Sequence, residues 1–158
     1  MSDYIQYIRE MVGHEPLILC ACGALLFNAQ DEVLLMLRTD NGCWGLPGGY
    51  MEMGETPEAC IMREVYEEVG VTFTNPTLLG AYAGEHSHYT YPNGDECYIT
   101  VLCYTGQFSG TPKCDGKEGE RAVFFPIEQL PHPINPPDQQ VLRDYLRTKW
   151  ALPKPAPF

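Results

Sequence analysis

The fold of this chain is decided between Gly48 and Val71, where the sequence reads GGYMEMGETPEACIMREVYEEVGV. Thr56 is suited to the N-cap of a helix, because its side chain accepts a hydrogen bond from a free backbone N–H. Pro57 suits the first helical position, where its missing N–H is not needed. Gly70 suits the end of the helix, where a left-handed residue is often required. The stretch therefore predicts one helix over residues 57–69.

Three carboxylates gather on one face of this predicted helix. Glu64, Glu67 and Glu68 stand three and four residues apart and so lie side by side. The residues expected on the opposite, buried face are Ala59, Met62, Val65, Tyr66 and Val69. Like charges at this spacing destabilise a helix, and divalent cations bind oxygen clusters of this kind. The alternative is an acidic face that is only hydrated.

The residues around the acidic face favour the functional interpretation. Arg63 lies four residues before Glu67, so its guanidinium can hold a carboxylate or reach back to Glu55. The glycine pair Gly48-Gly49 precedes the helix and lets the backbone approach other groups closely. A glycine turn, an arginine and four glutamates at fixed gaps are hard to explain as a hydrated surface.

This spacing resembles the Nudix box at every defining position: Gly49, Glu55, Arg63-Glu64-Val65, Glu67-Glu68 and Gly70-Val71. The box, residues 49–71, is a small part of the chain, but its fixed gaps make it a specific signal. The resemblance implies an α/β fold, the Nudix fold, in which a mixed β-sheet is sandwiched between helices. It also implies a metal-dependent hydrolase, MutT-like, that cleaves a diphosphate linkage in a nucleoside diphosphate joined to another group.

The resemblance also assigns roles within the box. Glu64, Glu67 and Glu68 would be metal ligands for Mg²⁺ or Mn²⁺, and the carbonyl of Gly48 would be a further ligand. Arg63, with Glu55, would orient the carboxylates. No defining position is substituted, which argues for an active enzyme.

One more carboxylate is expected from outside the box. Members of the resembled family often supply it from a loop before the last strand, and the candidates here are Glu118 and Glu120. Glu118 is preferred as a metal ligand and catalytic group. The base that takes a proton from water would be Glu64, Glu67 or this outside carboxylate.

Three further residues are candidates for substrate binding. Arg38 ends a predicted strand, where it would contact a phosphate or base or would be a surface charge. Trp44 would stack on a base or seal the core. Tyr89 would line a base pocket or form a cross-strand pair in a hairpin.

The identity of the substrate stays open. As the resemblance implies, a proline sixteen residues after the box marks ADP-ribose hydrolases, and this chain has Ser87 there. Tyr89, eighteen residues after the box, is weakly similar to the mark of dinucleoside-polyphosphate hydrolases. The candidates are a nucleoside triphosphate, an ADP-ribose-like compound or a dinucleoside polyphosphate. A silent nucleotide-binding sensor is the alternative from another class, and the intact box argues against it.

The remainder of the chain indicates one domain over residues 1–158. A short amphipathic helix over residues 3–12 would pack against the sheet or a second subunit, which would make a homodimer. Predicted strands at 16–27 and 32–38 form a hairpin, and a glycine-rich loop over 39–49 leads into the box. Further expected elements are a strand over 72–84 kinked at Pro76, a turn at Asn93-Gly94, strands over 96–108 and 121–127, a helix over about 136–149, and a mobile tail over 152–158.

Composition narrows the range of partners. The formal net charge of −11 opposes duplex nucleic acid and anionic membranes, which attract basic surfaces. A small-molecule nucleotide remains compatible, provided that a metal neutralises the site locally. No apolar run is long enough to span a bilayer, and the first residues lack a signal-peptide core. Seven cysteines without a CxxC pair indicate reduced thiols and a cytoplasmic location.

Overall fold

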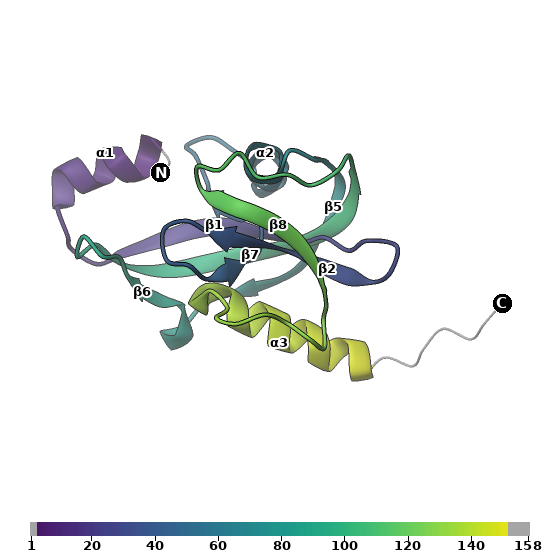
Figure 1. Cartoon of the computed structure of the whole chain (residues 1–158). Coiled ribbons are helices and arrows are strands. Elements are labelled where there is room, and N and C mark those ends of the chain that lie inside the picture. The colour runs from purple at the N-terminus through teal and green to yellow at the C-terminus, as the bar shows by residue number, and fades with distance from the viewer. Residues whose placement is uncertain (1–2, 152–158) are drawn as a thin grey trace.

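The computed structural model describes residues 3–151. Its helices are α1 (Asp3–Val12), α2 (Pro57–Val69) and α3 (Pro136–Ala151), and a short 3₁₀ turn, η1, covers Glu85–Ser87 (Figure 1). Its strands are β1 (Leu17–Leu25), β2 (Glu32–Arg38), β3 (Trp44–Gly45), β4 (Gly48–Tyr50), β5 (Thr72–Tyr82), β6 (His88–Thr90), β7 (Glu96–Ser109) and β8 (Gly119–Pro126).

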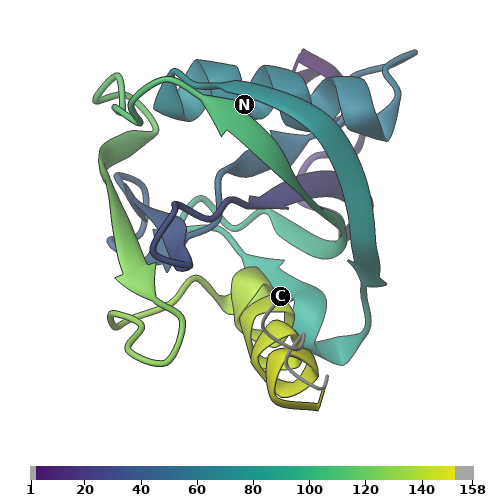
Figure 2. The same cartoon turned by 90° about the vertical axis from the view of Figure 1, so that its right-hand side faces the viewer.

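Two sheets lie between α2 and α3, as Figures 1 and 2 show. The larger sheet has the order β4-β1-β7-β5, with β6 added to β7, and the smaller one has the order β3-β2-β8. Strands β1 and β7 run parallel, whereas the other pairs are antiparallel. The predicted mixed sheet between helices is therefore confirmed.

The alternation of side chains along β2 explains how both faces of its sheet are buried. Successive side chains of a strand point to opposite faces, so Leu34 and Met36 pack in the cluster beneath α2. Val33 and Leu35 pack in a second cluster with the α3 residue Leu142. Burial on both faces fixes the position of each helix over the sheets.

Helix α2 begins and ends where its capping residues predict. The side chain of Thr56 accepts a hydrogen bond from the N–H of Ala59 at 3.2 Å. Gly70 adopts a left-handed conformation with φ of 68°, and its N–H donates to the carbonyl of Tyr66 at 3.0 Å. Local chemistry thus sets both ends of the helix.

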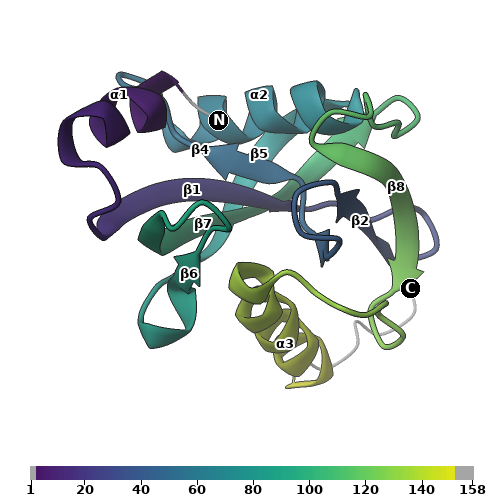
Figure 3. The same cartoon turned by 60° about the vertical axis from the view of Figure 1, so that its left-hand side comes forward.

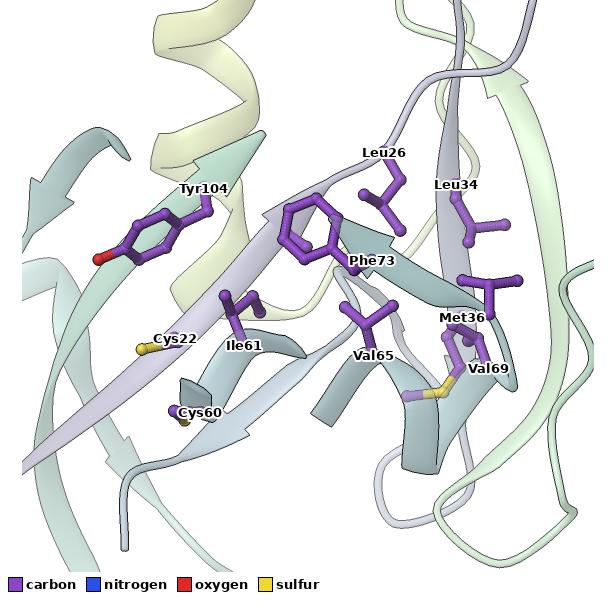
Figure 4. Close-up of a cluster of buried hydrophobic side chains, with 12 residues drawn as sticks. Cys22, Leu26, Leu34, Met36, Cys60, Ile61, Val65, Val69, Phe73 and Tyr104 are labelled. Carbon is purple, nitrogen blue, oxygen red and sulfur yellow. The ribbon is translucent and has the colours of Figure 1, made fainter. Parts of the chain in front are cut away.

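The buried face of α2 differs from the prediction. Ile61, Val65 and Val69 enter the core, as Figure 4 shows. Met62 and Tyr66, expected on this face, are 40% and 64% exposed. The buried face is rotated toward the acidic side, so it also includes two of the glutamates.

The predicted hairpin of residues 16–27 and 32–38 is wrong as a pairing of strands. The turn exists, but β1 and β2 belong to different sheets and meet only near Phe27 and Val33. Strand β1 instead pairs along its whole length with β7. The predicted loop over 39–49 also contains β3 and the start of β4. Strand β4 can pair with β1 because Gly48 has no side chain: a Cβ at Gly48 would overlap the carbonyl oxygen of Cys22.

The other predicted elements are confirmed with small shifts in their ends. The register of β5 against β7 is irregular between Thr74 and Thr77, the part of the strand that contains Pro76, where a kink is predicted. Asn93-Gly94 lies in the turn between β6 and β7. The tail over 152–158 lies outside the described residues. Nothing helical in residues 3–151 is both long and apolar enough to cross a membrane.

Helix α1 packs against the sheet, the first of its two predicted roles. Its Ile5 is 5% exposed and lies in a cluster with Leu19 of β1 and Cys97 of β7. Figure 3 shows α1 beside the start of β1. Its predicted role at a second subunit stays a prediction.

Gly106→Ala should destabilise the fold. A Cβ at Gly106 would lie 2.7 Å from the carbonyl oxygen of Thr74 and 2.8 Å from that of Asn75, where β7 faces the irregular part of β5. We expect the free energy of unfolding to fall by about 1–3 kcal/mol, measured by urea denaturation. Gly23→Ala is the matched control, since its Cβ would meet atoms no closer than 3.6 Å. Equal losses in both variants would contradict this explanation.

Candidate active site

One cavity of about 860 Å³ brings most of the predicted site residues together. It lies at the edge where β1 and β4 meet α2. The predicted residues that line it are Arg38, Gly48, Arg63, Glu64, Glu67, Glu68, Tyr89 and Glu118.

The glycine pair brings the backbone against the carboxylates of α2. The N–H of Gly48 donates to Oε2 of Glu68 at 2.8 Å. A Cβ at Gly49 would lie 2.5 Å from the carboxyl carbon of Glu64, so a larger residue would displace that side chain. Glu64 and Glu68 are 9% and 5% exposed. Because Gly48 and Gly49 have no side chains, the carboxylates of Glu64 and Glu68 can be buried against their backbone.

Arg63 joins the box residues into one network. Its Nε and Nη2 donate to the two carboxylate oxygens of Glu55 at 2.7 and 2.9 Å. Its Nη1 donates to Glu64 at 2.6 Å and to Glu67 at 3.2 Å. Both predicted contacts of Arg63, the one with a helix carboxylate and the one with Glu55, are thus present together. The hydrogen bonds from Arg63 lower the pKa of Glu55.

Burial and mutual repulsion act on the remaining carboxylates. Burial raises the pKa of Glu68 well above its ordinary value, and the charges of Glu64 and Glu118 raise it further. Burial also raises the pKa of Glu64, against the lowering effect of Arg63, with added repulsion from Glu67 and Glu118. Burial and repulsion both disfavour the ionised forms of Glu64 and Glu68, so a cation bound beside them would be stabilised.

The donor set of the cavity fits a divalent cation. Carboxylate and carbonyl oxygens are the ligands that Mg²⁺ and Mn²⁺ prefer, and Glu64, Glu68 and Glu118 lie near enough to repel one another. Within residues 3–151, no three acidic, histidine or cysteine side chains converge into a complete site. Arg63 holds Glu64 and Glu67 in this arrangement, so ligation by both requires their side chains to turn.

The structure separates the two candidates for the outside carboxylate. Glu118 lines the cavity, and its charge acts on both Glu64 and Glu68. Its carbonyl oxygen accepts hydrogen bonds from the N–H and hydroxyl of Thr39 at 3.0 and 3.1 Å, which anchors the loop. Glu120 is exposed on β8 and does not line the cavity.

Arg38 lies in the cavity wall with a partner already in place. Its Nε and Nη2 donate to the two oxygens of Asp40 at 2.9 and 2.8 Å. Its side chain is 27% exposed. A phosphate that binds Arg38 would have to share it with this carboxylate.

Trp44 seals the core, which is one of its two predicted roles. It is 8% exposed, packs edge-on against Phe125 with 4.9 Å between ring centroids, and is not among the residues that line the cavity. The guanidinium carbon of Arg121 lies 5.3 Å from the ring centroid of Trp44. The prediction that Trp44 binds substrate therefore finds no support in the geometry, because the core encloses the ring.

Tyr89 forms the predicted cross-strand pair and also lines the cavity, and its predicted contact with a base stays a prediction. It pairs with Cys97 across β6 and β7, and its ring also lines the cavity. Its hydroxyl accepts a hydrogen bond from Nδ2 of Asn41 at 3.2 Å, and its ring packs edge-on against Tyr91.

A polar group at the start of α3 was not predicted. Asp138 is buried and accepts hydrogen bonds from Nδ2 of Asn135 at 3.0 Å and from the N–H of Leu46 at 3.2 Å. Asn41 donates to Oδ1 of Asn135 at 3.1 Å. The sequence predicts a helix over about 136–149 at this point, and nothing in its local pattern shows that Asn135 and Asp138 contact residues 41–46.

Comparison with known proteins places these features in a family. The NUDIX domain model matches residues 19–145. A protein of Methanocaldococcus jannaschii named ADP-ribose pyrophosphatase is 31% identical over 127 residues, which are 78% of this chain and 71% of that protein. A protein of Bacillus subtilis named putative ADP-ribose pyrophosphatase YjhB is 33% identical over 75% of this chain, but only 57% of that protein.

A solved structure agrees with this match. The MutT NUDIX hydrolase of Burkholderia pseudomallei superposes with a TM-score of 0.69 at 29% identity, covering 80% of this chain and 96% of that one. Sequence, fold and the acidic helix lead to the same conclusion: the chain belongs to the NUDIX family of hydrolases.

Proposed function

We propose that this chain hydrolyses the diphosphate linkage of ADP-ribose or a closely similar compound. The observation that carries the proposal is the cavity in which the box carboxylates, Glu118 and the Gly48-Gly49 turn meet. The relatives named as ADP-ribose pyrophosphatases support the choice of substrate. A nucleoside triphosphate is the second candidate, because Ser87 stands where the ADP-ribose mark would have proline and because a MutT hydrolase shares the fold.

The proposed metal ligands are the carbonyl of Gly48 and the carboxylates of Glu64, Glu67, Glu68 and Glu118. These oxygens would hold Mg²⁺ or Mn²⁺, which would supply a Lewis acid for the diphosphate and would lower the pKa of a bound water molecule. The net charge of −11 repels an anionic substrate, and a bound cation would offset that repulsion at the site.

The other groups of the cavity position the reactants. Arg63 is a positioning residue that holds Glu64 and Glu67, and Glu55 fixes Arg63 in turn. Arg38 lines the cavity, from where it would contact the substrate. One of Glu64, Glu67 or Glu118 takes the proton from the attacking water.

A nucleotide panel tests the proposal directly. The purified protein is incubated with Mg²⁺ or Mn²⁺ at mildly alkaline pH, and the products are separated by chromatography. ADP-ribose should be cleaved faster than the other nucleotides, giving AMP and ribose 5-phosphate. Faster release of pyrophosphate and a monophosphate from a triphosphate would select the second candidate. EDTA should abolish turnover, and tight binding without turnover in either metal would indicate a sensor.

Glu67→Gln should lower kcat by about 100-fold, because it removes a charged ligand and a candidate base. Glu58→Gln is the matched control, since Glu58 lies on the same helix, is exposed and does not line the cavity. Steady-state kinetics with the fastest substrate of the panel measure both variants. A loss of less than about tenfold in Glu67→Gln would contradict a catalytic centre on this face.

Glu118→Gln and Glu120→Gln should differ sharply. Glu118 lines the cavity and acts on the box carboxylates, whereas Glu120 is exposed on β8. We expect Glu118→Gln to lose about tenfold or more in kcat, and to need more metal for half-maximal rate. Glu120→Gln should keep the original rate, and the opposite ranking would move the outside ligand to Glu120.

A further inference from the structure

We propose that Arg9 of α1 is a specificity-determining residue at the end of the cavity remote from the carboxylates. Together with Tyr50 and Tyr91, it binds an uncharged ring of the substrate that carries a hydrogen-bond acceptor. This inference rests on the proposed function, because it names the part of the substrate that the remote end recognises. It concerns a helix that lies outside the matched family region, residues 19–145.

The floor of the cavity gives the distance between its two ends. Gly23 pairs with Gly48 at the acidic end, and Leu19 pairs with Ile99 at the other. Gly23 and Leu19 are four positions apart on the strand, which is about 13 Å at roughly 3.3 Å per residue. A sugar with an attached ring can bridge such a span from a diphosphate held at the acidic end.

The remote end is walled by apolar and aromatic side chains. Ile5, Leu19 and Ile99 line this part of the cavity and belong to one buried cluster. Tyr89 and Tyr91 stand edge to face, with 4.7 Å between their ring centroids. Small-molecule sites commonly combine such walls with a few polar groups that fix orientation. A planar ring matches this lining better than a charged group does.

Arg9 is held in place but keeps hydrogen-bonding capacity. Its Nη1 donates to the carbonyls of Gly13 and Glu15 at 3.0 and 2.7 Å, and its Nη2 donates to that of Glu96 at 2.8 Å. Its buried Nε has no hydrogen-bond partner among residues 3–151. Nε has no open surface, so the group that can meet a ligand is Nη2, which carries two N–H groups and has the carbonyl of Glu96 as its one acceptor among residues 3–151.

The charge of Arg9 is already balanced. Oδ2 of Asp95 lies 3.6 Å from its Nε, too far for a hydrogen bond but close enough for an ion pair. Asp95 is itself engaged by His14 at 2.7 Å and by Nδ2 of Asn93 at 3.0 Å. The remote end therefore favours a neutral acceptor, such as a ring carbonyl or ring nitrogen, over a second phosphate.

Tyr50 and Tyr91 supply the other polar contact. Their hydroxyl oxygens are 2.6 Å apart, and both residues line the cavity. One hydroxyl donates to the other, which leaves one proton and further lone pairs for a ligand. Tyr50 also follows the glycine pair in β4, so the same short strand connects the two ends of the cavity.

Two probes separate the ends of the cavity in a binding experiment. The methylene analogue α,β-methylene-ADP carries a diphosphate group, a sugar and a base, whereas imidodiphosphate carries only the phosphate part. Calorimetric titration with Mg²⁺ present gives Kd for each. Arg9→Gln should weaken α,β-methylene-ADP by about tenfold, as expected for one lost hydrogen bond to a charged donor. The Kd of imidodiphosphate should not change.

Control variants separate recognition from folding. Arg147→Gln removes an arginine that is 81% exposed and should change neither Kd. Tyr91→Phe removes a hydroxyl but none of the contacts of α1, and should weaken only α,β-methylene-ADP. Equal weakening of both probes in Arg9→Gln and no effect in Tyr91→Phe would mean that Arg9 only docks α1, which would overturn the proposal. Unchanged binding in both variants would also overturn it.

The outcome is independent of turnover. If the wild-type protein binds α,β-methylene-ADP with the expected dependence on Arg9 but cleaves no nucleotide of the panel, the proposed reaction fails and the remote subsite stands. If it cleaves ADP-ribose while Arg9→Gln leaves both Kd values unchanged, the reaction stands and the subsite fails.

Discussion

The rest of the structure depends on one constraint, the burial of Glu64 and Glu68 against the backbone of Gly48-Gly49. Buried carboxylates are costly unless hydrogen bonds or opposite charges compensate them. Glu68 has the N–H of Gly48, and Glu64 has the guanidinium of Arg63. Both contacts require one rotation of α2 about its axis and one position of α2 over β4. The helix, the glycine turn and the strand therefore constrain one another's positions.

That placement comes from the apolar half of α2 and from its ends. Ile61, Val65 and Val69 are fully buried and fix the rotation of the helix. The cap at Thr56 and the left-handed Gly70 fix where it begins and ends. The packing free energy of this core offsets the cost of holding acidic groups close together. The stability of the domain and the chemistry of its site therefore rest on neighbouring residues of one helix, since Glu64 and Glu68 are buried beside Val65 and Val69.

Features that depend on neighbouring residues were predictable from the sequence, and features that depend on distant contacts were not. The bounds of α2 and the reach of Arg63 to Glu55 follow from local spacing. The rotation of α2 does not, since only the sheet decides that Glu64 is buried while Met62 is exposed. The pattern of apolar residues predicts where strands lie but not which strands pair, so the pairing of β1 with β7 could not be predicted from it. The contribution of Arg9 to the cavity depends on that same pairing.

The parallel pairing of β1 with β7 has a consequence for how the chain acquires its shape. Leu17–Leu25 must wait for Cys97–Thr105, about eighty residues later, before its central partner exists. During synthesis, β1 therefore lacks its full-length partner until more than half of the chain has been made, and only its residues 21–23 have an earlier partner, in β4. Contacts this distant in sequence slow folding. The floor of the cavity is thus completed late, and a nascent chain that ends before β7 contains the residues of the box but not the strand that completes the cavity beside them.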